Sequence, residues 1–199
     1  MANKALKLAI VIIIGLLLTT GCATIGTVKS LLDEPSFQQE NLPVRELKLA
    51  VATDGSRSRK NIEELIKKTS DLMEKQVGVR LIISHWFDIY WRSKDWDEMT
   101  DIFAARVQNC KNEFDVAVGF TNWNMVRSQA FVKKNRYIII RNFTVHAFAH
   151  ELGHAFLVGH SRSGLMAPNT GPFSGATDFF TAEDRERVLI NKWRNFTKD

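Results

Sequence analysis

The stretch from His150 to Pro168 reads HELGHAFLVGHSRSGLMAP, and it constrains the fold more than any other part of the chain. The chain has five histidines in 199 residues, and three of them, His150, His154 and His160, stand in this stretch at offsets of four and then six. Glu151 directly follows the first of them. Imidazoles spaced in this way beside a carboxylate are typical of a metal centre.

The first two of these histidines lie in a long, mostly apolar segment. Residues 145–158 follow a strand pattern, and Asn142 or Thr144 can cap them, so we expect a helix there. The two histidines then lie one turn apart on one face and can reach a single ion. Glu151 lies about 100 degrees further round the helix, where its carboxylate can meet a metal-bound water without being a ligand.

A catalytic zinc site needs a third protein ligand and leaves its fourth position open for water. His160 is the natural third ligand. Gly159 precedes it and can take the left-handed conformation that ends a helix and returns the chain toward the ion. The spacing therefore predicts one catalytic Zn²⁺, while the sequence leaves a requirement for calcium open.

The pattern resembles the active site of the metzincin zinc peptidases, and within them the matrixin (matrix-metalloproteinase-like) group. Their HExxHxxGxxH motif matches His150, Glu151, His154 and His160. Their methionine turn matches SGLMAP, so the resemblance implies that Met166 forms an apolar floor beneath the zinc. It also implies that Pro168 borders the substrate pocket for the residue after the scissile bond.

The chain departs from the family motif at one position. Leu157 stands where the family has the glycine that breaks the helix, and the nearest glycine is Gly159, two residues later. We therefore expect the helix to run longer than in the family. A longer helix changes the placement of His160, so Glu183 on the last predicted helix is the alternative third ligand, as in gluzincin-like peptidases.

The rest of the chain alternates strand and helix patterns from residue 46 onward. The strand patterns cover residues 47–53, 79–91, 114–120 and 136–142. The helix patterns cover residues 59–77, 95–110 and 181–195, the last two with Asp95 and Thr181 as caps. This order predicts an α+β, α/β-like sandwich around a mixed sheet in a domain of residues 46–199. The resemblance implies a zincin-type twisted sheet with an active-site helix and a C-terminal helix.

The N-terminal residues have the pattern of a secretory signal. Lys4 and Lys7 precede an apolar run over residues 8–18, and small residues then lead to Cys22. The sequence LLLTTGC resembles a bacterial lipobox, which implies a signal peptide of residues 1–21 and a lipidated Cys22. Residues 22–45 have the mixed composition of a tether. Ala23 favours the outer over the inner membrane, so we expect an exported, membrane-anchored lipoprotein.

Charge and cysteine content narrow the class further. The net charge of +5 comes from scattered lysines and arginines, so no nucleic-acid partner is expected. Cys110 has no partner for an intramolecular disulfide once Cys22 is lipidated, and we interpret it as a buried small hydrophobic residue.

Together these features predict an extracytoplasmic zinc metalloendopeptidase that acts on a peptide or protein, with Glu151 as general base. The alternative is an inactive zinc-binding lipoprotein. Glu151 argues against that alternative, because a purely structural zinc site has no use for an unliganded carboxylate and fills its fourth position.

Overall fold

The computed structural model describes residues 41–91, 95–122, 130–168 and 175–198. The predicted signal peptide, Cys22 and nearly all of the predicted tether lie outside these residues. No helix within them combines the length and the apolarity needed to cross a bilayer.

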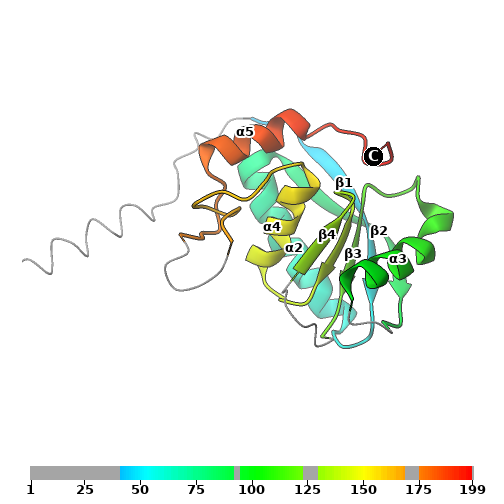
Figure 1. Cartoon of the computed structure of the whole chain (residues 1–199). Helices are drawn as coiled ribbons and strands as arrows, with labels where there is room; N and C mark the ends of the chain where they lie inside the picture. The colour runs from blue at the N-terminus through cyan, green and yellow to red at the C-terminus, as the bar shows by residue number, and fades with distance from the viewer. Residues whose placement is uncertain (1–40, 92–94, 123–129, 169–174, 199) are drawn as a thin grey trace, which may run out of the picture. The chain divides into compact units, whose positions relative to one another are not determined.

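One mixed sheet forms the centre of the domain (Figure 1). Its strands are β1 (Arg45–Thr53), β2 (Val79–Asp88), β3 (Val116–Phe120), β4 (Ala130–Lys133) and β5 (Tyr137–Ile140). They are arranged in the order β2-β1-β3-β5-β4. The strands β2, β1, β3 and β5 are parallel to their neighbours, and β4 runs antiparallel to β5 at the edge of the sheet. The predicted mixed sheet is confirmed.

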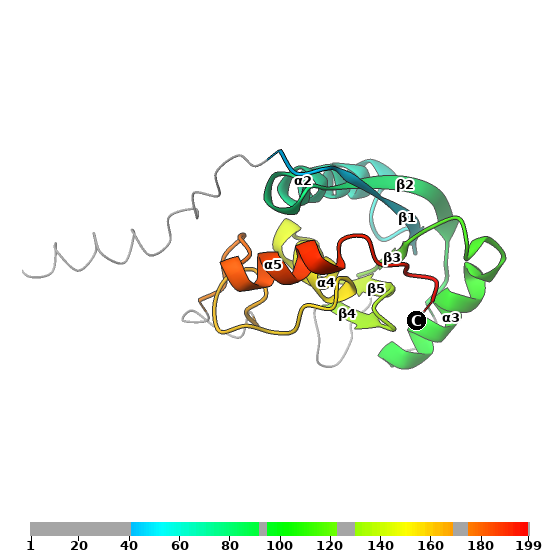
Figure 2. The same cartoon turned by 90° about the horizontal axis from the view of Figure 1, so that it is seen from above.

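Helices cover both faces of this sheet (Figures 1 and 2). They are α2 (Arg59–Val77), α3 (Trp96–Arg106), α4 (Val145–Ala155) and α5 (Ala182–Asn191), with a short 3-10 turn, η1 (Gln108–Cys110), after α3. The helices α2 and α4 lie on one face, α3 lies on the other, and α5 packs against α2. The predicted α/β-like sandwich is therefore a three-layer arrangement.

The central strand β1 explains why both faces are covered. Its residues Leu47, Leu49 and Val51 point into the core beneath α2 and α4, whereas Ala50 and Ala52 point into a second core beneath α3. All five are fully buried. Because alternate residues of a strand point to opposite faces, a strand that is apolar on both faces needs a helix on each side.

The helix starts follow the predicted capping chemistry. The side chains of Asp95, Thr144 and Thr181 each accept a hydrogen bond from the backbone N–H three residues later, at 2.9, 3.1 and 3.1 Å. Each bond satisfies one of the N–H groups that the first turn of a helix leaves without a partner. The cap that begins α4 is therefore Thr144, one of the two candidates.

Several predicted boundaries are wrong. The strand β2 ends at Asp88, three residues early, and α5 ends at Asn191, four residues early. β1 begins at Arg45, one residue inside the predicted tether, where the guanidinium pairs with Asp115 at 3.1 Å. The predicted helix to residue 110 ends at Arg106 and continues as a 3-10 turn. Cys110, in that turn, is only partly buried, which corrects the expectation of a core position.

Candidate metal centre

Three imidazoles converge at the end of α4. The Nε2 atom of His154 lies 3.1 Å from Nε2 of His150 and 3.2 Å from Nε2 of His160. The ligand atoms of the three residues all lie within 4.8 Å of one another. Zn–N bonds of about 2.0–2.1 Å in a tetrahedral site place pairs of nitrogens about 3.3 Å apart, so the three rings fit one zinc ion.

Backbone carbonyls fix the orientation of two of these rings. Nδ1 of His150 donates to the carbonyl of Leu165 at 2.8 Å, and Nδ1 of His154 donates to the carbonyl of Val158 at 2.7 Å. A proton held on Nδ1 leaves the lone pair of each ring on Nε2, the atom that faces the other histidines. The tautomer that a metal ligand needs is thereby set before any ion binds.

Burial also sets the charge of these rings. Desolvation lowers the pKa of His150 to about 4, against a smaller opposing effect of its bond to Leu165. Desolvation likewise lowers the pKa of His154. Both rings are therefore neutral at neutral pH, as ligation of a cation requires.

Glu151 follows the first of these histidines and is 9% exposed. Burial raises the pKa of its carboxyl group from 4.5 to about 7. A carboxyl group with a pKa near neutrality can take a proton in one step and return it in the next. This is the electrostatic setting that a general base and acid needs beside a metal centre.

The raised pKa leads to a pH prediction for the metal-free protein. Ionised Glu151 destabilises the folded state, because the folded pKa of about 7 lies above the unfolded value of 4.5. At pH 8 Glu151→Gln is expected to be more stable than the wild type by up to about 3 kcal/mol. At pH 4 the carboxyl group is protonated in both states, so the two proteins are expected to be equally stable. Urea unfolding in EDTA at several pH values measures the difference, and a gap that does not widen between pH 4.5 and 7 contradicts the assignment.

Met166 packs against the turn of α4 that carries the two histidines. It is fully buried, and a Cβ atom added at Gly153 would overlap its Sδ atom and lie 2.9 Å from its Cε atom. Gly153 stands directly before His154 in the HELGH sequence. The glycine therefore admits the methionine to the underside of the histidine-bearing helix.

The end of α4 differs from the prediction. The helix ends at Ala155 and not at residue 158, and the left-handed residue is Leu157 (φ 65°), not Gly159. The N–H of Leu157 donates to the carbonyl of His154 at 2.9 Å, and the N–H of Val158 donates to that of Gly153 at 3.1 Å. These two bonds form a Schellman motif, which needs a left-handed residue at position 157 whatever its side chain. The chain turns there even without the family glycine.

The buried side-chain amide of Gln76 is hydrogen-bonded to a segment that contacts the methionine turn. Nε2 of Gln76 donates to a carbonyl of segment 178–180 at 2.9 Å, and its Oε1 accepts an N–H of the same segment at 2.8 Å. That segment in turn accepts the N–H of Leu165 at 2.6 Å. The carbonyl of Leu165 orients His150, so a chain of hydrogen bonds runs from α2 to a candidate ligand. Nothing in the sequence indicates it, because Gln76 is 102 and 104 residues away from its two partners.

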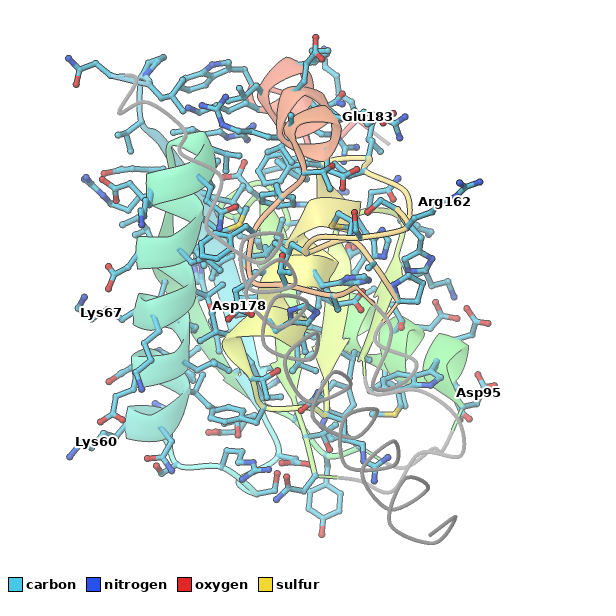
Figure 3. The ribbon with its side chains drawn as sticks, turned by 90° about the vertical axis from the view of Figure 1, so that its left-hand side faces the viewer. Lys60, Lys67, Asp95, Arg162, Asp178 and Glu183 are labelled. Atoms are coloured by element: carbon cyan, nitrogen blue, oxygen red, sulfur yellow. The ribbon has the colours of Figure 1, made fainter. Side chains whose placement is uncertain are left out.

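His146 lies one turn before His150 and stacks on it, with ring centroids 6.2 Å apart. Its side chain is 19% exposed, and Nδ1 lies 3.3 Å from Oδ1 of Asp178. Its Nε2 atom is buried and has no hydrogen-bond partner. In Figure 3 Asp178 lies between α2 and α4, which agrees with its bonds to both helices. Asp178 is 32 residues away in the sequence, so no local pattern of residue types indicates this contact.

The structure brings His160, and not Glu183, to the other two histidines. The side chain of Glu183 is 73% exposed and pairs with Arg187 at 2.6 Å on α5 (Figure 3). The alternative of Glu183 as third ligand therefore has no support in the described residues. Pro168 is exposed and is the last described residue before the gap at residues 169–174.

A hollow of about 350 Å³ opens beside the histidines. It is lined by Asn135, His154, Leu157, Val158 and Gly159. His154 belongs to both the hollow and the three-histidine group, so the hollow adjoins the candidate metal centre.

Comparison with solved structures identifies the fold. Archaemetzincin from Methanopyrus kandleri superposes with a TM-score of 0.58 at 15% identity, over 75% of this chain and 97% of that one. A chain from a chaperone–substrate complex also gives 0.58 at 14% identity, over 74% of this chain and 34% of that one. No protein-family model and no curated protein matches the sequence.

The chain therefore has a fold like that of archaemetzincin, and its described residues include three histidines that can hold a metal ion together. A zinc-dependent peptidase from Methanocorpusculum labreanum is similar at a lower level, with a TM-score of 0.48 and 12% identity over 70% of this chain and 99% of that one. At these identities the comparisons describe the fold alone.

Proposed function

We propose that the protein is an extracytoplasmic zinc-dependent metalloendopeptidase of matrixin-like type. The observation that carries the proposal is the convergence of the ligand atoms of three histidines within 4.8 Å of one another, at the end of the helix that also carries the buried carboxyl group of Glu151. Three imidazole nitrogens would hold a zinc ion and leave one coordination position open, so the carboxyl group of Glu151 is not needed as a ligand.

The residues present account for the chemistry of peptide hydrolysis. A bound Zn²⁺ would act as a Lewis acid on the scissile carbonyl and on the attacking water. Glu151 takes a proton from that water and then delivers it to the leaving amine nitrogen. Its pKa of about 7 suits both transfers, because neither protonation state is strongly favoured at neutral pH. His150, His154 and His160 would hold the ion, and the carbonyls that accept hydrogen bonds from His150 and His154 fix the orientation of these two rings.

An extended peptide suits the surface next to this site. The strand β4 pairs with β5 and, among the described strands, with no other, so its outer edge presents backbone groups that can bind an added strand. The helix α4, which carries His150 and His154, packs against β4. A peptide bound along β4 would therefore pass close to the candidate metal.

The first test is made on the wild type. Metal analysis is expected to give one zinc ion per chain, and a broad peptide library is expected to contain cleaved members. A protein that holds one zinc ion and cleaves nothing would instead be a binding-only lipoprotein.

The location of the protein is proposed from the sequence. We propose that residues 1–21 are removed and that lipidated Cys22 anchors the domain to the outer membrane, because the charged, apolar and small-residue zones end at Cys22. Cys22→Ala is expected to remove the lipid mass and to shift the protein into the aqueous phase on detergent partitioning. Cys110→Ala is the matched control and is expected to change neither. Full membrane partitioning of Cys22→Ala at the wild-type mass would refute the anchor.

A further inference from the structure

We propose that Leu157 is a specificity residue, whose side chain forms the apolar wall of a pocket for a bulky apolar side chain of the peptide substrate. The inference rests on the proposed peptidase function and names the substrate class. It depends on three observations at this one residue: its backbone conformation, its exposure and its position beside His154.

The backbone conformation of Leu157 is unfavourable for its side chain. A residue with φ of 65° at the end of a helix is usually glycine or asparagine, because other side chains crowd the backbone there. The other described non-glycine residues with positive φ are Lys134 and Asn135, in the β4–β5 turn. Leu157 is thus the apolar member of this set.

The side chain gains little from the core in return. Leu157 is 49% exposed, whereas its neighbours Phe156 and Val158 are 0% and 2% exposed. The two neighbours supply the packing that closes the end of α4. A half-exposed leucine in a strained conformation is therefore unfavourable on two counts in the free protein, and such residues gather at functional sites.

The position of Leu157 near the candidate metal centre indicates which part of a bound molecule would cover its side chain. Leu157 and His154 line the same hollow of about 350 Å³, and Nε2 of His154 faces the other two histidines. A peptide held at the candidate metal would lie next to this hollow. Binding sites of this size are mainly apolar and gain affinity by covering exposed apolar surface. An apolar substrate side chain would remove Leu157 from water, whereas a charged one would lose its own hydration there.

The test compares Leu157→Gly with the wild type in a positional-scanning peptide library. The wild type is expected to prefer Leu or Phe over Asp at one position by roughly 10-fold or more, the range for apolar contacts in a specificity pocket. Leu157→Gly is expected to lose about this preference at that position and to keep its others. Its Tm is expected to rise by about 2–4 °C, because glycine relieves the strain. A residue with only a structural role would not lower selectivity while raising Tm.

Two further variants separate backbone strain from the side chain. Leu157→Met keeps a long apolar side chain at the same φ and is expected to retain the preference. Lys134→Gly relieves a positive φ of 53° outside the lining of the hollow. It is expected to raise Tm without changing the preference. An unchanged preference in Leu157→Gly, or an equal loss in Lys134→Gly, would overturn the proposal.

A binding measurement separates this proposal from the proposed peptidase function. Fluorescent peptides that differ only by Leu or Asp at the selected position are titrated into Glu151→Gln with and without Leu157→Gly. If the wild type cleaves nothing, the library identifies no selected position. Binding is then measured for versions of one peptide that carry Leu or Asp at each position in turn. Apolar preference that disappears with Leu157→Gly supports the pocket even if the wild type cleaves nothing. Binding without this dependence overturns the pocket and leaves the peptidase function standing, whereas no binding at all overturns both.

Discussion

Glu151→Gln is expected to lower peptide turnover by about 10²–10⁴-fold, the effect of removing a general base, while the protein keeps one zinc ion per chain and its fold. Glutamine has nearly the same shape as glutamate but cannot take a proton from water. Because the candidate ligands are the three histidines, the metal should remain. The measurement is kcat on a peptide selected from the library, together with the zinc content of the same preparation.

Glu183→Gln is the matched control for this experiment. Glu183 is an exposed carboxylate paired with Arg187 on α5, so its loss should leave turnover unchanged. Turnover of Glu151→Gln at the wild-type rate would mean that another group activates the water. The buried and unpartnered Nε2 atom of His146 would then be the next candidate.

His154→Ala is expected to lose both zinc and activity. Its Nε2 atom lies 3.1 and 3.2 Å from those of the other two histidines, so its removal leaves two ligands that rarely hold zinc by themselves. His160→Ala is expected to weaken zinc binding by at least about 10-fold. Competition with a chelator of known affinity measures both losses.

Glu183→Gln again supplies the contrast. It is expected to keep the wild-type zinc stoichiometry, since its carboxylate is not part of the three-histidine group. Weaker zinc binding in Glu183→Gln together with full binding in His160→Ala would favour the gluzincin-like alternative.

The sequence predicted those parts of the fold that depend on local chemistry. Apolar periodicity identified the long helices, and the side chains of Asp95 and Thr181 identified where two of them begin. The edge strand β4 was missed, because it has four residues and its turn is formed by Lys134 and Asn135 at positive φ, without the glycine that signals a hairpin. The end of α4 was misplaced for a related reason: the left-handed residue that ends the helix is Leu157, so no glycine marks the turn.

The candidate site also has features that the sequence predicts and features that it does not. The spacing of the three histidines predicted that they converge, since the helix repeat and one turn bring them together. The role of Glu151 stays a prediction. The spacing does not reveal what orients the rings. Two of the groups that orient the rings are backbone carbonyls, those of Leu165 and Val158. A third, Gln76, acts across a large sequence separation. No pattern of residue types reports such contacts.

Arg45, at the start of β1, has a consequence for how the chain matures. Its guanidinium donates to the carbonyls of Lys192 and Arg194 and lies over the ring of Phe196, 4.9 Å from its centroid. The first strand of the domain is thus completed by some of its last residues. A chain emerging from the ribosome cannot make these contacts until residues 192–196 have been synthesised. If the chain is exported unfolded, as proposed, Arg45 would find these partners only after residues 192–196 had also crossed, 147 residues and more behind it.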